Sequence, residues 1–397
     1  MIYWRLNVLS RRTLSALVAL PVLVLTGCGG DDDGGVEPGL EKISYVVAGV
    51  AGESGHVGDD GPATDALLYW PIDMTVVPNG QLVIMDWNNH CARKIDADGN
   101  IHAFIGSGRL GDDRTGAMTA IDFNHPSDFK IGPDGSYYVA AFHNWAIRKI
   151  DPVTGQATTP VGKVAASGVG SVRGHEGDGG PANVASLNLP GSIDFDANGN
   201  LYITDQGNMR IRMVDPNGVI TLIAGGENGY ADGPALEARF NFEGEQATTG
   251  TGTRSGCIDI SKDGRYLYIA DTLNNRVRRL EFATGMVTTV AGTGAVGYSG
   301  DDGPALAATF NHPSDVVCTV SGDVYVSDRY NNVIRKIDPA GTITTVVGTG
   351  QAGFTPNGTP ARETKLYNPL GLDFDDANNT LYIADMYNHQ VLKVINP

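Results

Sequence analysis

The sequence has little positive charge. Lysine and arginine together number 28 against 45 aspartates and glutamates, which gives a formal net charge of −17. A nucleic-acid-binding protein needs a basic stripe that follows the phosphates, so this class of partner is disfavoured. An excess of acid is instead typical of solubility outside the cell or of attraction for cations.

Cysteine is scarce as well. Beyond the N-terminal segment only Cys91, Cys257 and Cys318 occur, and three cysteines cannot all pair. None stands in a Cys-x-x-Cys spacing, so the sequence does not indicate a disulfide framework. Cys318 shares its strand position with Phe195 and Ile260, where a small buried hydrophobic side chain is expected.

Sustained helical periodicity and the common catalytic signatures are missing. The chain has no Gly-x-Ser-x-Gly elbow, no phosphate-binding loop and no tight histidine cluster of the kind that binds catalytic zinc. Its acidic glycine loops, such as Gly58–Gly61, lack the spacing and the terminal glutamate of an EF-hand. These absences leave no ready-made catalytic centre.

What the sequence does have is one short phrase, Tyr-Ile-x-Asp, in six related copies. They recur roughly every 60 residues, a period typical of propellers and other repeat proteins. One copy has lost its aspartate and ends in Ala141. The copies are Val83–Asp86, Tyr138–Ala141, Tyr202–Asp205, Tyr268–Asp271, Tyr325–Asp328 and Tyr382–Asp385.

Each repeat predicts four strands. A short mixed strand such as Ser192–Phe195 precedes the Tyr-Ile-x-Asp strand, a third strand carries an arginine such as Arg212, and a fourth resembles Ile220–Ile223. Val, Ile, Tyr and Thr alternating between Gly, Asn, Asp and Pro turns are typical of strands and hairpins. We therefore predict an all-β protein, a six-bladed β-propeller of four-stranded blades.

The sequence resembles the NHL-repeat family of β-propellers over residues 41–397. Two blades depart from the pattern, because Ala141 replaces the aspartate of blade 2 and Leu392 replaces the arginine of blade 6. The resemblance implies a propeller but leaves the function open, because this scaffold hosts enzymes, receptors and binding modules. Besides the Tyr-Ile-x-Asp and Asn-x-Ile-Arg strands, it rests on Gly-Asp-Gly-Gly-Pro-Ala loops at Gly177–Ala182, Gly58–Ala63 and Gly300–Ala305.

The two ends of the repeat region complement each other. Val391–Val394 reads as a third strand with no fourth strand after it. Ile43–Gly49 matches the missing fourth strand. We therefore expect residues 43–48 to complete blade 6 and close the ring, which leaves no open sheet edge at this point.

Residues 1–27 are predicted to be a signal peptide rather than part of the fold. Arg5, Arg11 and Arg12 precede an apolar run that is too short to span a bilayer comfortably. The run ends in Leu-Thr-Gly-Cys, which resembles the lipobox of bacterial lipoproteins and implies cleavage before Cys28 and acylation of that cysteine. Residues 28–40 then form an acidic Gly/Asp tether.

The residue after Cys28 is Gly29 rather than aspartate, which by analogy with lipoproteins argues against retention at the inner membrane. We therefore expect a lipoprotein of the cell envelope at the outer membrane, on its periplasmic side or at the cell surface. An ordinary cleaved secretory signal is the alternative.

The first strands carry acidic residues at two levels near the axis. Alignment on the following turn glycine places Asp73, Asp128 and Asp315 at one level. Like charges this close repel unless a cation lies among them, and Ca²⁺ prefers oxygen ligands. The candidate cofactor is therefore an axial Ca²⁺ or similar ion at these three residues. The alternative is that the aspartates accept backbone N–H bonds or face channel water.

The long loops of all blades are expected on one face, where rigid scaffolds usually bind ligands. Asn124-His125 in blade 2 and Asn311-His312 in blade 5 belong to one shared tract, and these blades lie opposite each other in a six-membered ring. We predict these four residues as candidate ligand contacts, with a simple loop anchor as the alternative. The blade 4 insertion, Glu243–Arg254, fits a floppy connection and a ligand-contacting flap equally well.

Two functions follow. The first is a membrane-anchored, non-catalytic binding module whose loop face takes a protein or a glycan. The second is a metal-dependent hydrolase or lyase that resembles the propeller lactonases and uses the axial ion. The full ligand set of that lactonase family does not map onto this sequence residue by residue.

Overall fold

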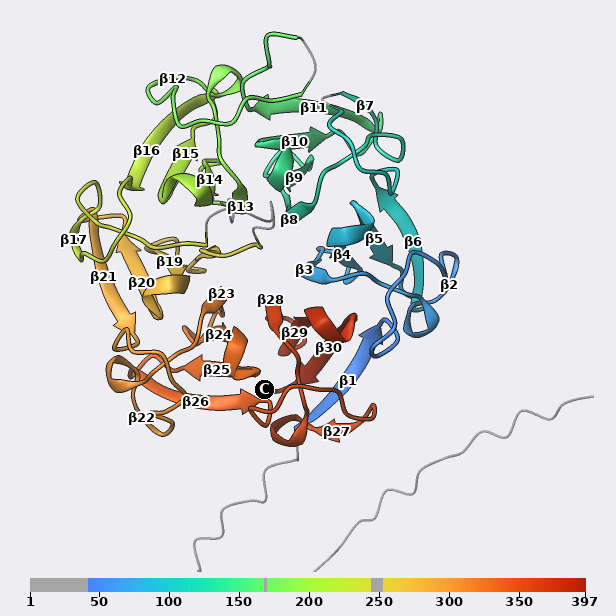
Figure 1. Ribbon diagram of the computed structural model, residues 1–397, viewed down its shortest axis with the longest axis vertical. Helices are drawn as coiled ribbons and strands as arrows, with labels where there is room; N and C mark the ends of the chain where they lie inside the picture. Colours follow the sequence, from blue (N-terminus) through green and yellow to red (C-terminus); the bar gives the residue numbers. More distant parts are fainter. Residues whose placement is uncertain (1–41, 114, 168–169, 244–252) are drawn as a thin grey trace, which may run out of the picture. The chain divides into compact units, whose positions relative to one another are not determined.

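The computed structural model describes residues 42–113, 115–167, 170–243 and 253–397. Within this part of the chain, six antiparallel sheets stand around one axis as the blades of a propeller (Figure 1). No helix among the described residues is long and apolar enough to cross a membrane. The predicted signal peptide, Cys28 and the tether at 28–40 lie outside the described residues.

The strands of a blade follow one another outward from the axis. Blade 1 has β3 (Pro71–Val76), β4 (Leu82–Asp86), β5 (Cys91–Ile95) and β6 (Asn100–Ile105); blade 2 has β8 (Pro126–Ile131), β9 (Tyr137–Ala141), β10 (Ala146–Ile150) and β11 (Gln156–Val161). Blade 3 has β13 (Pro190–Phe195), β14 (Leu201–Asp205), β15 (Arg210–Val214) and β16 (Val219–Gly225); blade 4 has β18 (Ile258–Ile260), β19 (Tyr266–Asp271), β20 (Arg276–Glu281) and β21 (Met286–Ala291). Blade 5 has β23 (Pro313–Cys318), β24 (Val324–Asp328), β25 (Val333–Ile337) and β26 (Thr342–Val347); blade 6 has β28 (Pro369–Asp375), β29 (Thr380–Asp385), β30 (Gln390–Ile395) and β1 (Ile43–Ala48).

The predicted six-bladed propeller is confirmed, but each blade has five strands rather than four. The additional strand has two residues and pairs with the outermost long strand. A two-residue strand is too short to produce an alternating pattern, so sequence periodicity cannot reveal it. These strands are β2 (Gly61–Pro62), β7 (Gly116–Ala117), β12 (Gly180–Pro181), β17 (Gly233–Pro234), β22 (Gly303–Pro304) and β27 (Thr359–Pro360).

The predicted ring closure is confirmed. Strand β1 pairs antiparallel with β30, with Tyr45 opposite Lys393 and Val46 opposite Leu392. The blue N-terminal strand therefore lies beside the red C-terminal strand in Figure 1. Blade 6 is thus built from both ends of the described chain.

Layers of side chains between neighbouring blades form the core. The Ile or Val of the Tyr-Ile-x-Asp phrase is no more than 1% exposed in every blade. Burying such a side chain contributes about 1.5–3 kcal/mol relative to leaving it exposed. Because each blade covers the next, the repeat is stable only as part of the ring. The residues are Ile84, Val139, Ile203, Ile269, Val326 and Ile383.

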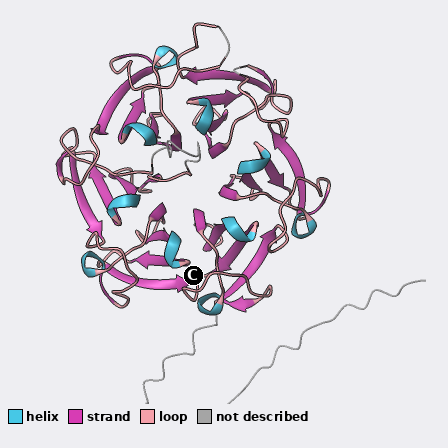
Figure 2. Cartoon of the chain, viewed as in Figure 1, coloured by secondary structure: helices cyan, strands magenta, loops and turns pink. Residues whose placement is uncertain are grey.

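All described helices are single 3₁₀ turns (Figure 2). One group follows the second strand of each blade: η2 (Trp87–Asn89), η3 (Phe142–Asn144), η5 (Gln206–Asn208), η6 (Thr272–Asn274), η8 (Arg329–Asn331) and η10 (Met386–Asn388). The other group follows the short outer strands: η1 (Ala63–Asp65), η4 (Ala182–Val184), η7 (Ala305–Ala307) and η9 (Ala361–Glu363).

Candidate functional site

The aspartate that ends the second strand is bonded on all sides by the fold. In blade 4, Asp271 accepts hydrogen bonds from the backbone N–H of Asn241 at 2.8 Å and from Nδ2 of Asn274 at 2.9 Å. Its Oδ2 lies 2.6 Å from Nη1 of Arg278, which also pairs with Asp232 of the acidic glycine loop. The same arginine–aspartate pairs recur in blades 1, 3 and 5. The most strongly repeated motif is therefore structural.

Blade 2 lacks this aspartate, but other residues make the equivalent hydrogen bond and ion pair. Ala141 stands where the aspartate would be, and the backbone N–H of Asn124 donates instead to Oδ1 of Asn144 at 2.8 Å. Arg148 pairs with Asp112 at 2.5 Å. The predicted ligand contact Asn124 is thus part of the loop framework.

Blade 6, which also departs, leaves a carboxyl group without an arginine partner among the described residues. Leu392 occupies the arginine position, and Asp385 is 1% exposed. Its partners are the backbone N–H of Tyr367 at 2.7 Å and Nδ2 of Asn388 at 2.6 Å. Burial raises the pKa of Asp385 to about 7, against these two hydrogen bonds, which favour the ionised form.

This raised pKa predicts that acid stabilises the fold through Asp385. Between the usual aspartate pKa and about 7, the folded chain binds a proton at Asp385 that the unfolded chain does not. The protonated carboxyl therefore adds to the free energy of unfolding, and this addition is complete at low pH and is lost as the pH rises through 7. Asp385→Asn, which cannot ionise, should therefore lose less unfolding free energy than the wild type between about pH 5 and pH 8, by up to about 3 kcal/mol. Urea unfolding at each pH measures the difference. Asp263→Asn, at an exposed carboxyl whose pKa is lowered, is the control, and a wild-type slope in Asp385→Asn would contradict the assignment.

The aligned carboxylates of the first strands surround a single buried arginine. Nη1 of Arg254 lies 2.9 Å from Oδ1 of Asp73 and 3.2 Å from Oδ2 of Asp315, and Nη2 lies 3.3 Å from Oδ2 of Asp128. Its Nε donates to the carbonyl oxygen of Gly191 at 3.2 Å. Arg254 precedes the first strand of blade 4 and so binds blades 1, 2, 3 and 5 at the axis. The cation that the carboxylates require is here a side chain.

The three carboxylates at this level outnumber the one guanidinium, and a bound proton reduces the excess negative charge. Oδ2 of Asp73 and Oδ1 of Asp128 have no hydrogen-bond partner when both groups are ionised. Burial raises the pKa of Asp73 well above its usual value, whereas for Asp128 Lys130 and Arg254 outweigh burial and lower the pKa. A proton on Asp73, shared with Asp128, gives both orphan oxygens a partner and leaves Arg254 facing two ionised carboxylates, those of Asp128 and Asp315, instead of three.

The carboxylates also join each blade to the next. Oδ2 of Asp128 accepts the backbone N–H of Ile193 in blade 3 at 2.8 Å, and Oδ2 of Asp315 accepts that of Leu372 in blade 6 at 2.9 Å. In blades 3, 4 and 6 the aspartate two positions further along the first strand makes the same contact with the next blade. Together, the aspartates of both levels join each blade to the next from blade 2 to blade 6, and they also join blade 6 to blade 1. These second-level acceptors are Asp194, Asp259 and Asp373.

Gly371 shows how closely the blades approach at the axis. A Cβ atom at this position would lie 2.4 Å from the carbonyl oxygen of Ile72 and 2.7 Å from Cα of Asp73. Only glycine fits here without moving the backbone of blade 1.

A cavity of about 530 Å³ opens at the tight-turn end of the axis. Its walls include Lys130 and Lys262 together with the second-level carboxylates. Nζ of Lys262 lies 3.8 Å from Oδ2 of Asp259. Burial and the neighbouring Asp259 raise the pKa of Asp194 to about 7. Lysine side chains therefore supply positive charge at this level too.

The axial groups are poor candidates for catalysis. Asp73 and Arg254 are each 2% exposed, Asp315 is 3% exposed and Asp128 is fully buried, so a substrate cannot reach them in this conformation. Among the described residues, no group of three or more His, Cys, Asp or Glu side chains is arranged to hold a metal ion. The axial Ca²⁺ remains a prediction, and Arg254 competes with it for the same carboxylates.

The two predicted histidines belong to separate clusters. Nδ1 of His125 lies 2.6 Å from Oδ1 of Asn124, and its ring packs on Trp87 and His90. Burial, together with His90 and His143, lowers the pKa of His125 to about 3, so this imidazole stays neutral.

His312 packs on Tyr330, with ring centroids 4.5 Å apart, and its Nδ1 lies 2.9 Å from Oδ1 of Asn311. The backbone N–H of Asn311 donates to Asp328 at 2.8 Å. His125 contacts a second imidazole, because its Nδ1 lies 3.1 Å from Nδ1 of His143.

Two other histidines bond the blades together on the loop face. The residue before the first-strand proline has a left-handed backbone, as at Trp70 and His125, and its N–H donates to the preceding blade. Nδ1 of His389 accepts the N–H of Trp70 at 3.2 Å, and Nδ1 of His90 accepts that of His125 at 3.3 Å. Asn275 and Asn332 accept the same bond in blades 4 and 5. His90 and His389 therefore replace asparagine as acceptors, and burial lowers the pKa of both.

The ends of the blade 4 insertion are firmly bonded, whereas residues 244–252 lie outside the described residues. The carboxylate of Glu243 lies 3.3 Å from Nη1 of Arg329. Nε2 of Gln206 donates to the carbonyl oxygens of Glu243 and Thr253. Thr253 is one residue from Arg254, so these bonds fix the segment that carries the axial guanidinium.

Blades 6 and 1 present a continuous group of aromatic rings on the loop face. We call the side chains of Tyr69, Trp70, Tyr367, Tyr387 and His389 the aromatic arc. Ring centroids of successive members lie 5.1–5.8 Å apart. Tyr69 is 38% exposed and Tyr367 is 43% exposed. The repeat pattern does not reveal this arc, because only the backbone N–H groups of Tyr69 and Tyr367 make the repeated bond, to Asp86 and Asp385.

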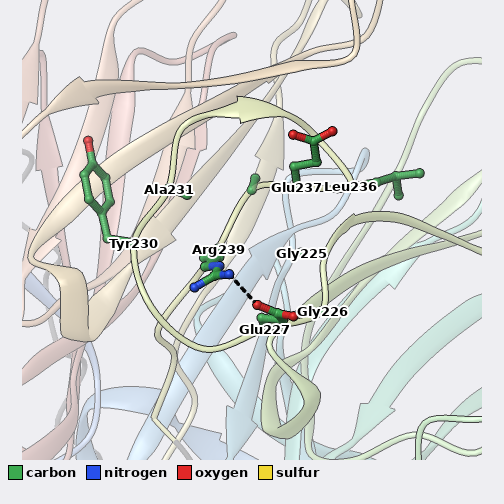
Figure 3. Close-up of a pocket in the computed structure, with 9 residues that line it drawn as sticks. Gly225, Gly226, Glu227, Tyr230, Ala231, Leu236, Glu237 and Arg239 are labelled. Atoms are coloured by element: carbon green, nitrogen blue, oxygen red, sulfur yellow. Dashed lines mark ion pairs between the residues drawn. The ribbon is translucent and has the colours of Figure 1, made fainter.

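The outer part of blade 4 has a separate hollow of about 590 Å³ (Figure 3). Its lining includes Tyr230, Leu236 and an ion pair of 2.7 Å between Glu227 and Arg239, drawn as a dashed line. Both charged side chains of the pair are more than half exposed. Such a pair adds little rigidity, so the hollow lacks a fixed polar anchor.

Comparison with known proteins supports the NHL resemblance. The profile of the Teneurin NHL domain matches residues 161–247 and 284–396, about half of the chain. NHL repeat-containing protein 2 of Bos taurus is 27% identical over 361 residues, which cover 84% of this chain and 47% of that protein. The chain spans less than half the length of the curated relatives it matches.

Solved structures with the same fold include proteins of different function. An auxiliary nutrient binding protein from Bacteroides thetaiotaomicron superimposes with a TM-score of 0.62 at 15% identity, covering 89% of this chain and 76% of that one. A gluconolactonase from Xanthomonas campestris gives a TM-score of 0.51 at 13% identity, covering 83% and 86%. At such identities the likeness concerns the fold alone.

Proposed function

The chain belongs to the Teneurin NHL domain family, and we propose that it is a binding module without catalysis whose loop face holds the ligand. One observation carries this proposal: the axial carboxylates, which the sequence predicts as a metal site, are buried and bonded to Arg254 and to backbone N–H groups. The aromatic arc, by contrast, is accessible on the face where rigid scaffolds carry their binding loops.

The metal-dependent hydrolase remains the second candidate. It is supported by the acidic character of the axis and by the fold shared with a gluconolactonase. It requires an ion to displace Arg254 from Asp73, Asp128 and Asp315, and a path to groups that are at most 3% exposed. The binding function needs neither change.

Binding and catalysis can be separated with one pair of variants. We expect the immobilised chain to retain material from a bacterial envelope extract, and the double variant Tyr69→Ala with Tyr367→Ala to retain much less. Tyr45→Ala is the matched control, because Tyr45 is 36% exposed but lies on β1. Equal retention by the double variant would contradict the loop-face proposal, as would lactone hydrolysis that wild type catalyses and Asp128→Asn does not.

We further propose that acyl chains on Cys28 anchor the module in the cell envelope, at the outer membrane. The lipobox-like motif and the acidic tether support this proposal. Cys28→Ser should move the protein, expressed in bacteria, from the detergent phase to the aqueous phase on phase separation. Unchanged partitioning of this variant would contradict the anchor.

A further inference from the structure

The aromatic arc combines stacking surfaces with unused polar groups. Among the described residues, no side chain or backbone group bonds to the hydroxyls of Tyr69, Tyr367 and Tyr387 or to Nε1 of Trp70. Tyrosine and tryptophan with one apolar side and one free polar tip are typical of interfaces, because the ring supplies contact area at a low entropic cost. A matching ligand therefore offers apolar faces and hydrogen-bonding groups side by side.

The arc is also electrically neutral. None of its side chains carries a formal charge at neutral pH, and burial alone accounts for the lowered pKa of His389, without a charged neighbour. The carboxyl groups of Asp86 and Asp385, which accept the backbone N–H of Tyr69 and Tyr367 at 2.7 Å, are buried, and the arginine of the neighbouring blade, Arg329, pairs with Glu243. A sulfated, phosphorylated or sialylated ligand would find no cation here, and the net charge of −17 would repel it.

The aromatic arc is less suited to binding a peptide. Peptides that add a strand to a sheet need an open strand edge. In every blade the outermost long strand is already paired with a two-residue strand. A proline-rich peptide could still stack on the rings, so it is the natural competitor in a test.

We propose that the aromatic arc binds a neutral oligosaccharide, with sugar rings stacked on Trp70 and Tyr367 and sugar hydroxyls bonded to the tyrosine hydroxyls. This inference rests on the proposed function and names its ligand class. The rings at 5.1–5.8 Å spacing span two neighbouring blades, so the occupant is a chain of several sugars rather than a single one.

Calorimetric titration of the full chain in detergent tests the inference. The probes are maltohexaose, cellohexaose, laminarihexaose, mannohexaose and chitohexaose, with decaproline as the peptide competitor. We expect at least one hexasaccharide to bind, and Tyr367→Ala and Trp70→Phe each to weaken that binding about tenfold or more, as for central aromatic contacts. Tyr45→Ala, an exposed tyrosine outside the arc, should bind as the wild type does.

Other results overturn the inference. No heat with any hexasaccharide, equal affinity in all variants, or arc-dependent binding of decaproline instead of sugars would each contradict it. The retention assay distinguishes a wrong ligand class from a wrong function of the loop face. If the hexasaccharides fail but envelope material is still retained in a Tyr367-dependent way, the site stands and the ligand class is wrong. If retention does not depend on Tyr367, the loop-face function itself fails.

Discussion

Arg254→Met should lower the free energy of unfolding by about 3–5 kcal/mol, the usual effect of removing one partner from a buried ion pair. The guanidinium contacts Asp73, Asp128 and Asp315, none more than 3% exposed, and methionine fills the space without neutralising their charge. Urea unfolding followed by far-ultraviolet circular dichroism measures the change.

Two further variants sharpen this test. Arg265→Met removes an arginine that is 63% exposed and pairs with Asp263 at 3.9 Å, and it should change stability by less than about 1 kcal/mol. Adding Asp315→Asn to Arg254→Met should cost less than the two single changes combined, because Asp315 no longer needs the guanidinium. A loss under about 1 kcal/mol for Arg254→Met, or strict additivity, would contradict the axial role of Arg254.

Deletion of residues 41–48 should lower the melting temperature by on the order of 10 °C or more. Strand β1 supplies four cross-strand pairs to β30 and two to β27, each worth about 0.2–1 kcal/mol, and buries Ser44 and Ala48. Its loss also exposes the edge of β30. For a chain of this size each kcal/mol is worth about 2–4 °C. An unchanged melt would contradict the closure of the ring by β1.

A cross-link tests the same closure in a chain that keeps every residue of the strand. Tyr45 and Lys393 are direct partners in the antiparallel ladder, where opposite Cα atoms stand about 4.5–5.5 Å apart and a disulfide fits. Tyr45→Cys with Lys393→Cys should form a disulfide under mild oxidation and raise the melting temperature, because it closes a very long loop. The pair Tyr45→Cys with Lys336→Cys, which joins residues on different blades, should not form.

The sequence predicted the ring because the ring consists of repeats. The Tyr-Ile-x-Asp phrase recurs because Asp271 and its equivalents hold the loop that enters the first strand, and Ile269 and its equivalents fill the space between blades. The fourth-strand character of Ile43–Gly49 sufficed to predict its pairing with β30. Because the aspartate makes the same bond in five of the six blades, it recurs visibly in the sequence.

Arg254 and the aromatic arc could not be found in this way. Arg254 follows an insertion present in blade 4 alone, so aligning the repeats gives it no counterpart. The signal that was available is electrostatic: Asp73, Asp128 and Asp315 require a cation, and an arginine lies three residues before Cys257, which shares their level. The arc is hidden because the repeat uses only the backbone N–H of Tyr69 and Tyr367 and leaves their side chains free to vary.

The decisive measurement is the melting temperature of the purified chain with excess EDTA and with excess CaCl₂, alongside its metal content. If Arg254 is the cation among the axial carboxylates, the wild type contains no stoichiometric ion and melts at the same temperature in both solutions. A stoichiometric Ca²⁺ whose removal by EDTA lowers the melting temperature would contradict this account and place a metal, rather than Arg254, among Asp73, Asp128 and Asp315.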